Sequence, residues 1–327
     1  MTYVVGIDVS KAKLDCLWLR DPATLKVKTK VVSNDTKGHK TLQQWLPKTL
    51  QVAPENILVV MEATGVYHEQ IALALFESGF QVAVVNPARV KAYAQSLGNT
   101  HKTDKQDSLI IARFGAERRT KLWQPEALEI RELKALIARL EALEVDHQRE
   151  ANRLEKAEVS TTSETVRDSI QNMLEELVKE KRRIEDEIDD HINRHPHLKR
   201  DKALLESIPG VGPVISRLML SVIHSRDFES AKQVAAYLGV IPTQVESGVF
   251  RGRSALSKRG PASVRAKLYM AAVAASQCNP DVTALKQRLL ANGKNKMQAV
   301  GAAMRKLVHI CFGVIKNQAE YMPQAAA

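Results

Sequence analysis

Four carboxylates lie where a metal-assisted reaction could use them. Asp8 ends an apolar run that predicts a buried strand, and Glu62 ends a second run of the same kind. Placing a carboxylate next to a buried strand costs free energy of folding unless the carboxylate is paired with another group or binds a cation. Asp104 and Asp107 are three residues apart, so on a helix they share one face and can address one site. Four oxygen ligands without Cys or His suit Mg²⁺ or Mn²⁺ and not zinc.

An acidic cluster of this kind suits phosphoryl transfer. Two ions about 3.5–4 Å apart polarise the phosphate, activate an oxygen nucleophile and stabilise the leaving oxygen. A structural alternative exists for Asp104 and Asp107, because Thr103 and Gln106 fit a capping box and acids in a first helical turn complement the helix dipole. The order of all four acids along the predicted strands and helices favours the metal site.

A serine offers a second kind of chemistry. Ser247 stands in a Glu-Ser-Gly sequence just ahead of a basic, glycine-rich loop. A serine hydroxyl is a poor nucleophile without a base, a metal or surrounding cations. From the residues alone Ser247 fits an ordinary turn, and Ser254 and Ser257 are equally available. The loop can approach a phosphate backbone closely. Its predicted nucleic-acid contacts are Arg251, Arg253, Lys258 and Arg259.

A glycine-rich turn and the charge distribution also indicate nucleic acid. Residues 204–213 join two helical patterns through Gly210 and Gly212. This is typical of a helix-hairpin-helix, whose amides hold a DNA phosphate, although a plain helical packing element fits equally well. The net charge is +11, and from Leu198 onward there are 19 Lys and Arg against 7 Asp and Glu. A positive excess in one segment indicates a nucleic-acid binder; the alternative is that these cations only solubilise the surface.

The elements that must position the acids follow a recognisable order. Residues 3–9, 13–19 and 25–32 predict three successive strands, and the fully apolar residues 57–61 predict a buried central strand. Helices are predicted over 36–50, 67–77 and from about 88, with a strand over 81–85. This is the element order of an RNase H-like α/β fold.

One further interpretation of the first strand must be weighed. Residues 6–10 also resemble the first phosphate loop of actin-like sugar kinases, which share an RNase H-like core. Such a kinase repeats this core in a second half, with another glycine-rich phosphate loop. Residues 126–195 are instead densely charged and helical in pattern, which disfavours the kinase.

Those charged residues predict two long amphipathic helices around a polar turn, an antiparallel coiled-coil hairpin. The hairpin could serve dimerisation or pack on its own chain. Residues 195–197, His-Pro-His, predict a solvated linker. We therefore expect three domains, over residues 1–122, 123–197 and 198–327, of which the last is mainly helical.

The remaining features point to the bacterial cytoplasm. No stretch approaches the ~18 uninterrupted apolar residues of a membrane span, and the N-terminus lacks the pattern of a signal peptide. The three cysteines lack metal-ligand spacing and are odd in number, which predicts reduced thiols.

Taken together, these motifs resemble those of the DEDD transposases of bacterial insertion sequences, the insertion sequence 110 family. The resemblance covers essentially the whole chain in the right order. The N-terminal motifs that carry it are Gly6-Ile7-Asp8, Glu62-Ala63-Thr64-Gly65, Asn86-Pro87 and Lys102-Thr103-Asp104-Lys105-Gln106-Asp107. The C-terminal ones are Ser207-Ile208-Pro209-Gly210-Val211-Gly212, Glu246-Ser247-Gly248 and Ser257-Lys258-Arg259-Gly260.

The resemblance implies a RuvC-like N-terminal domain whose four acids match Asp8, Glu62, Asp104 and Asp107. It also implies that the serine matching Ser247 attacks a DNA phosphodiester and forms a transient phosphoserine bond, with the acidic site and its metal completing the reaction. A structured guide RNA that pairs with donor and target DNA is implied as well.

We therefore expect a metal-dependent serine recombinase that acts on double-stranded DNA as a homo-oligomer, a dimer or a tetramer. Two alternatives stay open. A RuvC-like junction nuclease would use water, so that Ser247→Ala keeps cleavage. A non-catalytic nucleic-acid-binding protein would be unaffected by alanine at Asp8 or Glu62.

Overall fold

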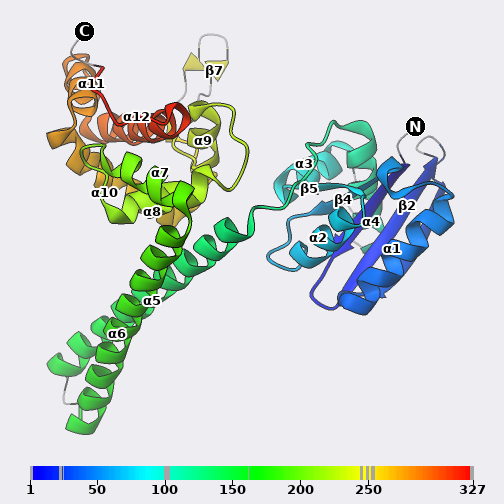
Figure 1. The fold of residues 1–327 in the computed structure, drawn as a ribbon, viewed down its shortest axis with the longest axis horizontal. Coiled ribbons are helices and arrows are strands. Elements are labelled where there is room, and N and C mark those ends of the chain that lie inside the picture. Colours follow the sequence, from blue (N-terminus) through cyan, green and yellow to red (C-terminus); the bar gives the residue numbers. More distant parts are fainter. Residues whose placement is uncertain are drawn as a thin grey trace. The chain divides into compact units, whose positions relative to one another are not determined.

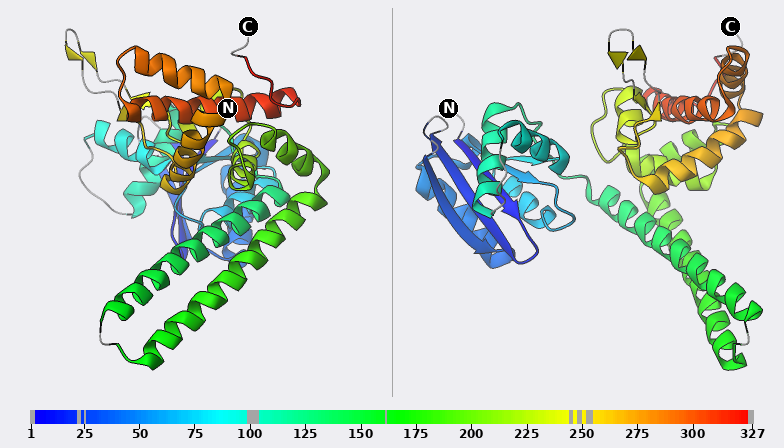
Figure 2. Two further views of the ribbon diagram at one scale, coloured as in Figure 1. Left: turned by 90° about the vertical axis from the view of Figure 1, so that its left-hand side faces the viewer. Right: turned by 180° about the vertical axis from the view of Figure 1, so that it is seen from behind.

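The structure, a computed structural model, describes residues 3–21, 24, 26–98, 104–160, 162–243, 246–247, 250–251 and 255–324. Of residues 104, 105, 246, 247, 250 and 251 it describes the backbone only. The chain forms two compact units, Met1–Pro125 and Glu126–Ala327. Figures 1 and 2 show the elements of each unit, which are described separately below.

The first unit is built on one mixed sheet. Its strands are β1 (Tyr3–Val9), β2 (Lys13–Asp21), β3 (Lys26–Ser33), β4 (Ile57–Glu62) and β5 (Gln81–Val85). The order is β3-β2-β1-β4-β5, antiparallel from β3 to β1 and parallel from β1 to β5. The three-strand meander followed by alternating helices and strands is the predicted order, and it fits an RNase H-like N-terminal domain.

Helices cover both faces of this sheet (Figure 1). They are α1 (Thr36–Leu50), α2 (Glu69–Glu77), α3 (Pro87–Ser96) and α4 (Asp104–Glu117), with a short 3-10 helix over Pro54–Asn56. Apolar side chains of α1 and α2 form one core with Val5, Ile7, Val59 and Met61. Those of α3 and α4 form a second core with Leu58 and Val60 on the opposite face. Alternate residues of β1 and β4 therefore face different helix layers.

Element boundaries differ slightly from the prediction. β4 continues through Glu62, so this acid belongs to the strand itself. α2 begins at Glu69 and not at Tyr67, because residues 65–68 form a turn. α1 runs through Pro47 and ends at Leu50; the residue after it, Gln51, has a left-handed backbone and donates its N–H to the Pro47 carbonyl oxygen at 2.8 Å.

The second unit begins with a long helical hairpin, visible in Figures 1 and 2. α5 (Leu128–Val159) and α6 (Glu164–Arg194) pack side by side. At the base of the hairpin, buried Ile130, Leu133, Ile188 and Ile192 join the core of the helical domain that follows. The hairpin and this domain therefore share one apolar core.

The sequence predicts a solvated linker at residues 195–197; Pro196 and His197 are indeed exposed, but the structure contradicts the linker. α6 ends at Arg194 and α7 begins at Pro196, so His195 alone separates the two helices. Its Nδ1–H donates to the carbonyl oxygen of His191 at 2.7 Å, and the two imidazole rings lie 4.6 Å apart. Proline explains the error, because at the first position of a helix it starts the helix and the missing N–H has no intrahelical partner to lose.

The helical domain contains the rest of the chain. Its helices are α7 (Pro196–Glu206), α8 (Pro213–Ile223), α9 (Ala231–Tyr237), α10 (Ala262–Cys278), α11 (Pro280–Ala291) and α12 (Lys296–Asn317). Of the described helices, α12 is long and apolar enough by length and composition to cross a membrane. Half of that stretch is buried in the domain, where α12 packs on α7, α9, α10 and α11. α12 is the central helix of this core.

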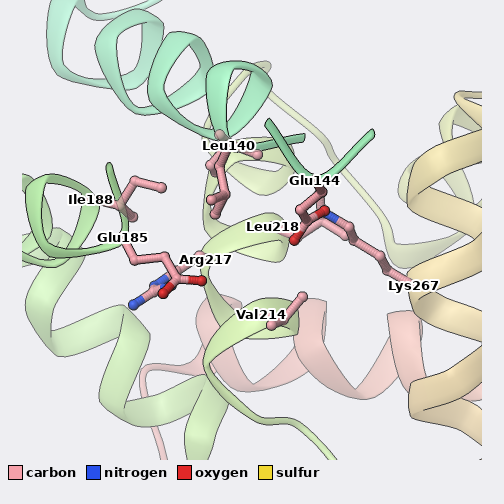
Figure 3. Close-up of a pocket in the computed structure, with 9 residues that line it drawn as sticks. Leu140, Glu144, Glu185, Ile188, Val214, Arg217, Leu218 and Lys267 are labelled. Carbon is pink, nitrogen blue, oxygen red and sulfur yellow. The ribbon is translucent and has the colours of Figure 1, made fainter. Parts of the chain in front are cut away.

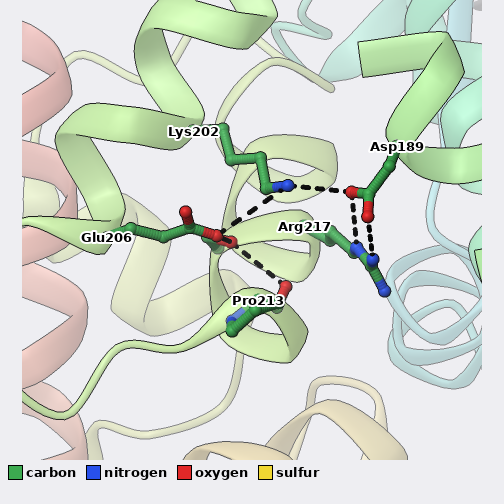
Figure 4. Close-up of polar contacts among 6 residues, drawn as sticks. Asp189, Lys202, Glu206, Pro213 and Arg217 are labelled. Atoms are coloured by element: carbon green, nitrogen blue, oxygen red, sulfur yellow. Dashed lines mark hydrogen bonds and ion pairs between the residues drawn. The ribbon is translucent and has the colours of Figure 1, made fainter. Parts of the chain in front are cut away.

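A polar network joins the hairpin to the helical domain (Figure 4). Asp189 on α6 accepts hydrogen bonds from Arg217 at 3.1 and 2.5 Å and from Lys202 at 2.8 Å. Burial disfavours ionisation of Asp189, but the hydrogen bonds and charges of Arg217 and Lys202 outweigh burial and hold the pKa of this carboxyl below its usual value. The Arg217 side chain is 12% exposed and that of Asp189 is 36% exposed, so this pair is partly shielded from solvent.

A small cavity lies beside this network (Figure 3). It is lined by apolar residues such as Leu140 and Ile188, with Glu144 and Lys267 at its edge. Lys267 of α10 lies 3.1 Å from Glu141 and 3.3 Å from Glu144 of α5. The cavity volume is about 30 Å³, room for one or two water molecules and far below the ~300 Å³ of a small-molecule site. This gap therefore belongs to packing.

Replacing Asp189 with Asn should lower the free energy of unfolding by about 1–3 kcal/mol, because two largely buried cations lose their charged acceptor. Glu176→Gln is the matched control on the same helix, since the side chains of Glu176 and Lys179 are 69% and 68% exposed and a pair screened by solvent should contribute much less than the Asp189 network. Urea denaturation of the full chain measures both.

The pH dependence of the Asp189 effect follows from its lowered pKa. The stabilisation is present above the ordinary carboxyl pKa of about 4 and is lost as the pH falls through the folded-state value. The difference between parent and Asp189→Asn should therefore persist at neutral pH and disappear below about pH 4. Equal stabilities at neutral pH would contradict the role of the network.

Candidate functional site

Asp8 and Glu62 lie side by side on one face of the sheet. β1 and β4 are parallel neighbours, and Ile7 pairs with Met61, so the next residue on each strand is one of the two acids. Strands are about 4.8 Å apart in a sheet. Ile7 and Met61 face α1 and α2, and alternation turns both acids toward the α3 and α4 layer. Both side chains are half-buried.

α4 brings the other two acids to the same edge. A Cβ on Gly6 would lie 2.2 Å from the carbonyl oxygen of Ser108, and a Cβ on Gly115 would lie 2.4 Å from Val60 Cγ2 and 3.2 Å from Val4 Cγ1. α4 therefore runs antiparallel to β1. Its later residues lie over the start of β1, and its first turn lies near the carboxyl ends of β1 and β4. Asp104 and Asp107 are in that first turn.

The four acids share an edge and supply only hard oxygen donors, the set that Mg²⁺ and Mn²⁺ prefer. Asp8, Glu62 and Asp107 each interact with another group in the structure. No three metal-ligating side chains converge closely enough to hold an ion within the described part of the chain, which leaves out the side chain of Asp104. The donor chemistry and the shared face fit a divalent ion, and binding requires these carboxylates to exchange their present partners for it.

A fifth acid stands on this face that the sequence analysis did not single out. Asp15 on β2 is the direct register partner of Asp8. Like charges at such positions repel each other. Lys13 Nζ lies 3.1 Å from Asp15 Oδ2, and the Asp15 side chain is 14% exposed. The strand alternation of residues 13–19 was the available signal, but the pairing of β1 with β2 was needed to see it.

Ser247 lies on a narrow β arm between α9 and α10. The base of the arm pairs β6 (Pro242–Thr243) with β9 (Ala255–Leu256), and farther out β7 (Glu246–Ser247) pairs with β8 (Phe250–Arg251). Ser247 is the register partner of Phe250. The β7–β8 ladder projects from the helices in Figures 1 and 2. The side chains of Ser247 and Arg251 are not described, and Arg253 lies outside the described residues.

Of the two other serines in the basic loop, Ser254 and Ser257, the structure describes only Ser257. Ser254 lies outside the described residues. Ser257 donates its backbone N–H to the Ile241 carbonyl oxygen at 2.9 Å, and its Oγ is buried without a hydrogen-bond partner in the described part of the chain. A buried hydroxyl is not accessible to a phosphodiester in this conformation.

Lys258 and Arg259 project from a turn packed on the end of α9. A Cβ on Gly239 would lie 2.7 Å from the Gly260 nitrogen, and one on Gly260 would lie 2.4 Å from the Tyr237 carbonyl oxygen. Lys258 has a φ of 54°, in the left-handed region, and its N–H donates to the Gly239 carbonyl oxygen at 3.2 Å. Both cations are exposed. Backbone contact thus fixes the turn that presents them.

The two glycines of the 207–212 turn have different surroundings. Gly210 has a φ of 90°, and a Cβ there would lie 2.6 Å from Ala275 Cβ on α10. Asn279 Nδ2 donates to the neighbouring Pro209 carbonyl oxygen at 3.2 Å. Packing on α10 accounts for Gly210 without a phosphate. Gly212 is exposed, with no atom within 4 Å of its Cβ position, and it precedes α8 as its N-cap.

The geometry can be compared with known proteins. The transposase model named for the DEDD transposases of IS110 matches residues 5–161, and the model of the IS116/IS110/IS902 transposase family matches residues 202–287. The chain is 30% identical over 325 residues to the pilin gene-inverting proteins of Moraxella bovis and Moraxella lacunata, covering 97% of this chain and 96% of each of those.

Among solved structures, the chain is similar to RuvC of T. thermophilus in complex with a Holliday junction substrate. The match covers 38% of this chain and 100% of the RuvC chain, at 16% identity and a TM-score of 0.26. This likeness is too slight to transfer any site. The two Moraxella relatives are decisive for the family, because each alignment covers nearly the whole of this chain and of the relative. The chain belongs to the IS110 family of transposases and is a DNA recombinase.

Proposed function

We propose that this recombinase cuts and rejoins double-stranded DNA through a phosphoserine intermediate at Ser247, with assistance from a divalent ion held by Asp8, Glu62, Asp104 and Asp107. The observation that supports it most is the common edge of the acids: two neighbouring strands and the first turn of α4 carry all four. The Moraxella relatives are named for inverting a gene, a reaction that requires strands to be cut and rejoined.

In the proposed reaction the Ser247 hydroxyl oxygen attacks phosphorus, and the bond from phosphorus to one deoxyribose oxygen breaks. The serine proton leaves, and the departing oxygen takes up a proton. The reverse attack by another DNA end restores the phosphodiester and frees the serine. A bound Mg²⁺ or Mn²⁺ would supply charge stabilisation for the phosphate.

The same proposal assigns the nucleic-acid contacts. Lys258 and Arg259 are exposed on a fixed turn, and Arg251 and Arg253 belong to the arm that carries the serine. Gly212 is open to a phosphate approaching the N-terminus of α8. A structured guide RNA and assembly into a dimer or tetramer, with the hairpin as a coiled coil, complete the proposal.

The acids can be tested by Asp8→Asn and Glu62→Gln. Either change should reduce DNA cleavage by about 100-fold or more, because several kcal/mol of transition-state stabilisation depend on the bound ion. Asp15→Asn is the matched control, since Asp15 lies on the same face but is paired with Lys13, and it should keep most of the activity. Cleavage that survives in both test variants would show that these acids do not take part, whereas a parent chain that binds DNA without cutting it would favour a non-catalytic binding protein.

The serine can be tested by trapping the protein on a nicked DNA substrate and mapping the linkage by mass spectrometry. The parent should form an adduct at Ser247, and Ser247→Ala should form none. Combining Ser247→Ala with Asp8→Asn should be no worse for strand transfer than either change alone, as for groups that act as one unit. An adduct at Ser254 or Ser257 would overturn the assignment. Cleavage by Ser247→Ala without any adduct would favour water as the nucleophile.

The cations can be tested through the salt dependence of DNA binding. Replacing Arg251, Arg253, Lys258 and Arg259 with Ala should reduce the slope of log affinity against log salt by about four units, about one per lost phosphate contact. A control with the same charge change replaces four hairpin cations that already pair with acids: Arg149, Arg153, Lys179 and Arg183. Equal slopes for the two variants would show that the arm does not meet phosphates.

A further inference from the structure

One side chain bridges the two loops that follow Asp8 and Glu62. Asn34, between β3 and α1, donates from Nδ2 to the carbonyl oxygen of Ser10 at 2.9 Å and to that of Tyr67 at 3.1 Å. Ser10 comes two residues after Asp8, and Tyr67 comes five residues after Glu62. A single amide group therefore links both loops at the carboxyl edge of the sheet.

The acceptor side of the same amide is fixed by a buried histidine. His39 Nε2 lies 2.8 Å from Asn34 Oδ1, and His39 is only 5% exposed. Because an amide oxygen can only accept, Nε2 carries the hydrogen in this contact. The backbone N–H of Asn34 donates to the Ala12 carbonyl oxygen at 3.0 Å. His39 and the two carbonyl groups together determine how the Asn34 amide is oriented.

Hydrogen bonds continue from Asn34 to the backbone of Glu62. The Tyr67 carbonyl oxygen accepts from Asn34, the Tyr67 N–H donates to the Thr64 carbonyl oxygen at 3.3 Å, and the Thr64 N–H donates to the Glu62 carbonyl oxygen at 2.9 Å. The turn after β4 is thus held at one end by the strand and at the other by Asn34. α2 follows this turn directly, with the Glu69 N–H donating to the Val66 carbonyl oxygen at 3.2 Å, so losing Asn34 removes the side-chain link between the two loops and not the turn itself.

We propose that Asn34, oriented by His39, is a positioning residue of the acidic site. It holds the loops after β1 and β4 at a fixed separation, so that Asp8 and Glu62 stay within reach of one divalent ion. This inference rests on the proposed metal role of those acids. Groups that orient metal ligands without touching the metal contribute about 10–100-fold to metal affinity. A residue that only supported the fold would change stability and leave the metal affinity of the folded protein unchanged.

The test measures Mn²⁺ binding to the full chain by electron paramagnetic resonance, without DNA and without an activity readout. Asn34→Ala removes both donors to the loops and should raise the Mn²⁺ dissociation constant by about 10–100-fold. Asn86→Ala is the control: Asn86 is the N-cap of α3, where its side chain accepts from the Ala88 N–H at 2.8 Å, and within the described residues this side chain makes no hydrogen bond to either loop. It should lose some stability and keep the parent affinity.

His39 supplies a rescue experiment. His39→Ala removes the donor to Asn34 Oδ1 and should weaken Mn²⁺ binding. His39→Gln should restore it, because the glutamine amide can place a donor near the position of Nε2. Combining His39→Ala with Asn34→Ala should weaken binding no further than Asn34→Ala alone, since both changes break one linkage.

The outcomes separate this inference from the function on which it rests. A parent chain that binds no Mn²⁺ would overturn the metal site and the positioning role together. A parent that binds Mn²⁺ while Asn34→Ala binds it equally well would overturn the positioning role alone. If Asn34→Ala does not fold, the comparison of His39→Ala with His39→Gln decides, and equal affinities for these two would overturn the inference.

Discussion

The contact between the backbones of α4 and β1 at Gly6 is the constraint on which the acidic edge depends. The Ser108 carbonyl oxygen lies 2.2 Å from the place where a Cβ of Gly6 would be, so any larger residue would push α4 off the sheet. Divalent ions bind oxygen at about 2.0–2.6 Å, and a helix displaced by the width of a methyl group would carry Asp107 out of that range. The absence of a side chain at Gly6 therefore lets α4 pack closely on β1, and this packing sets the position of Asp104 and Asp107.

The same edge collects negative charge, and the chain offsets part of it locally. Asp8 faces Asp15 across a strand pair, and Lys13 lies 3.1 Å from Asp15. Asp104 and Asp107 stand in the first turn of α4, where the positive end of the helix dipole favours carboxylates by about 0.3–1 kcal/mol each. The interpretation that these two acids stabilise the start of the helix is therefore compatible with the interpretation that they bind a metal ion. The dipole favours keeping these acids together, and the proposed divalent ion would bind to them there.

Local patterns in the sequence account for most of the sheet and for the acids on it. Apolar alternation and run length predict β1 and β4, and their parallel pairing brings Asp8 and Glu62 together. Asn34 and Asp15 could not be predicted in this way, because their importance depends on partners that only the folded topology brings near. The linker prediction for residues 195–197 was wrong for the opposite reason. Their composition is typical of a linker, but a proline at the first position of a helix overrides that composition. Gly210 fits two explanations in sequence, and only its contact with Ala275 reveals the packing one.

The cations of the C-terminal segment show why net charge alone does not measure nucleic-acid binding. Lys202, Arg217 and Lys267 are paired with carboxylates of the hairpin, so their charge is neutralised within the unit. Other cations have no carboxylate partner in the described part of the chain: Lys232, Lys258, Arg259, Arg305 and Lys306.

The charge of three of these cations reaches His309. Burial lowers the pKa of His309, and the positive charges of Arg305, Lys306 and Lys232 lower it further. The acidic residues of the hairpin thus pair with one set of cations and leave another set without a carboxylate partner in the described part of the chain. The salt dependence of DNA binding should reflect the second set and not the total, because only unpaired cations exchange counterions for phosphates.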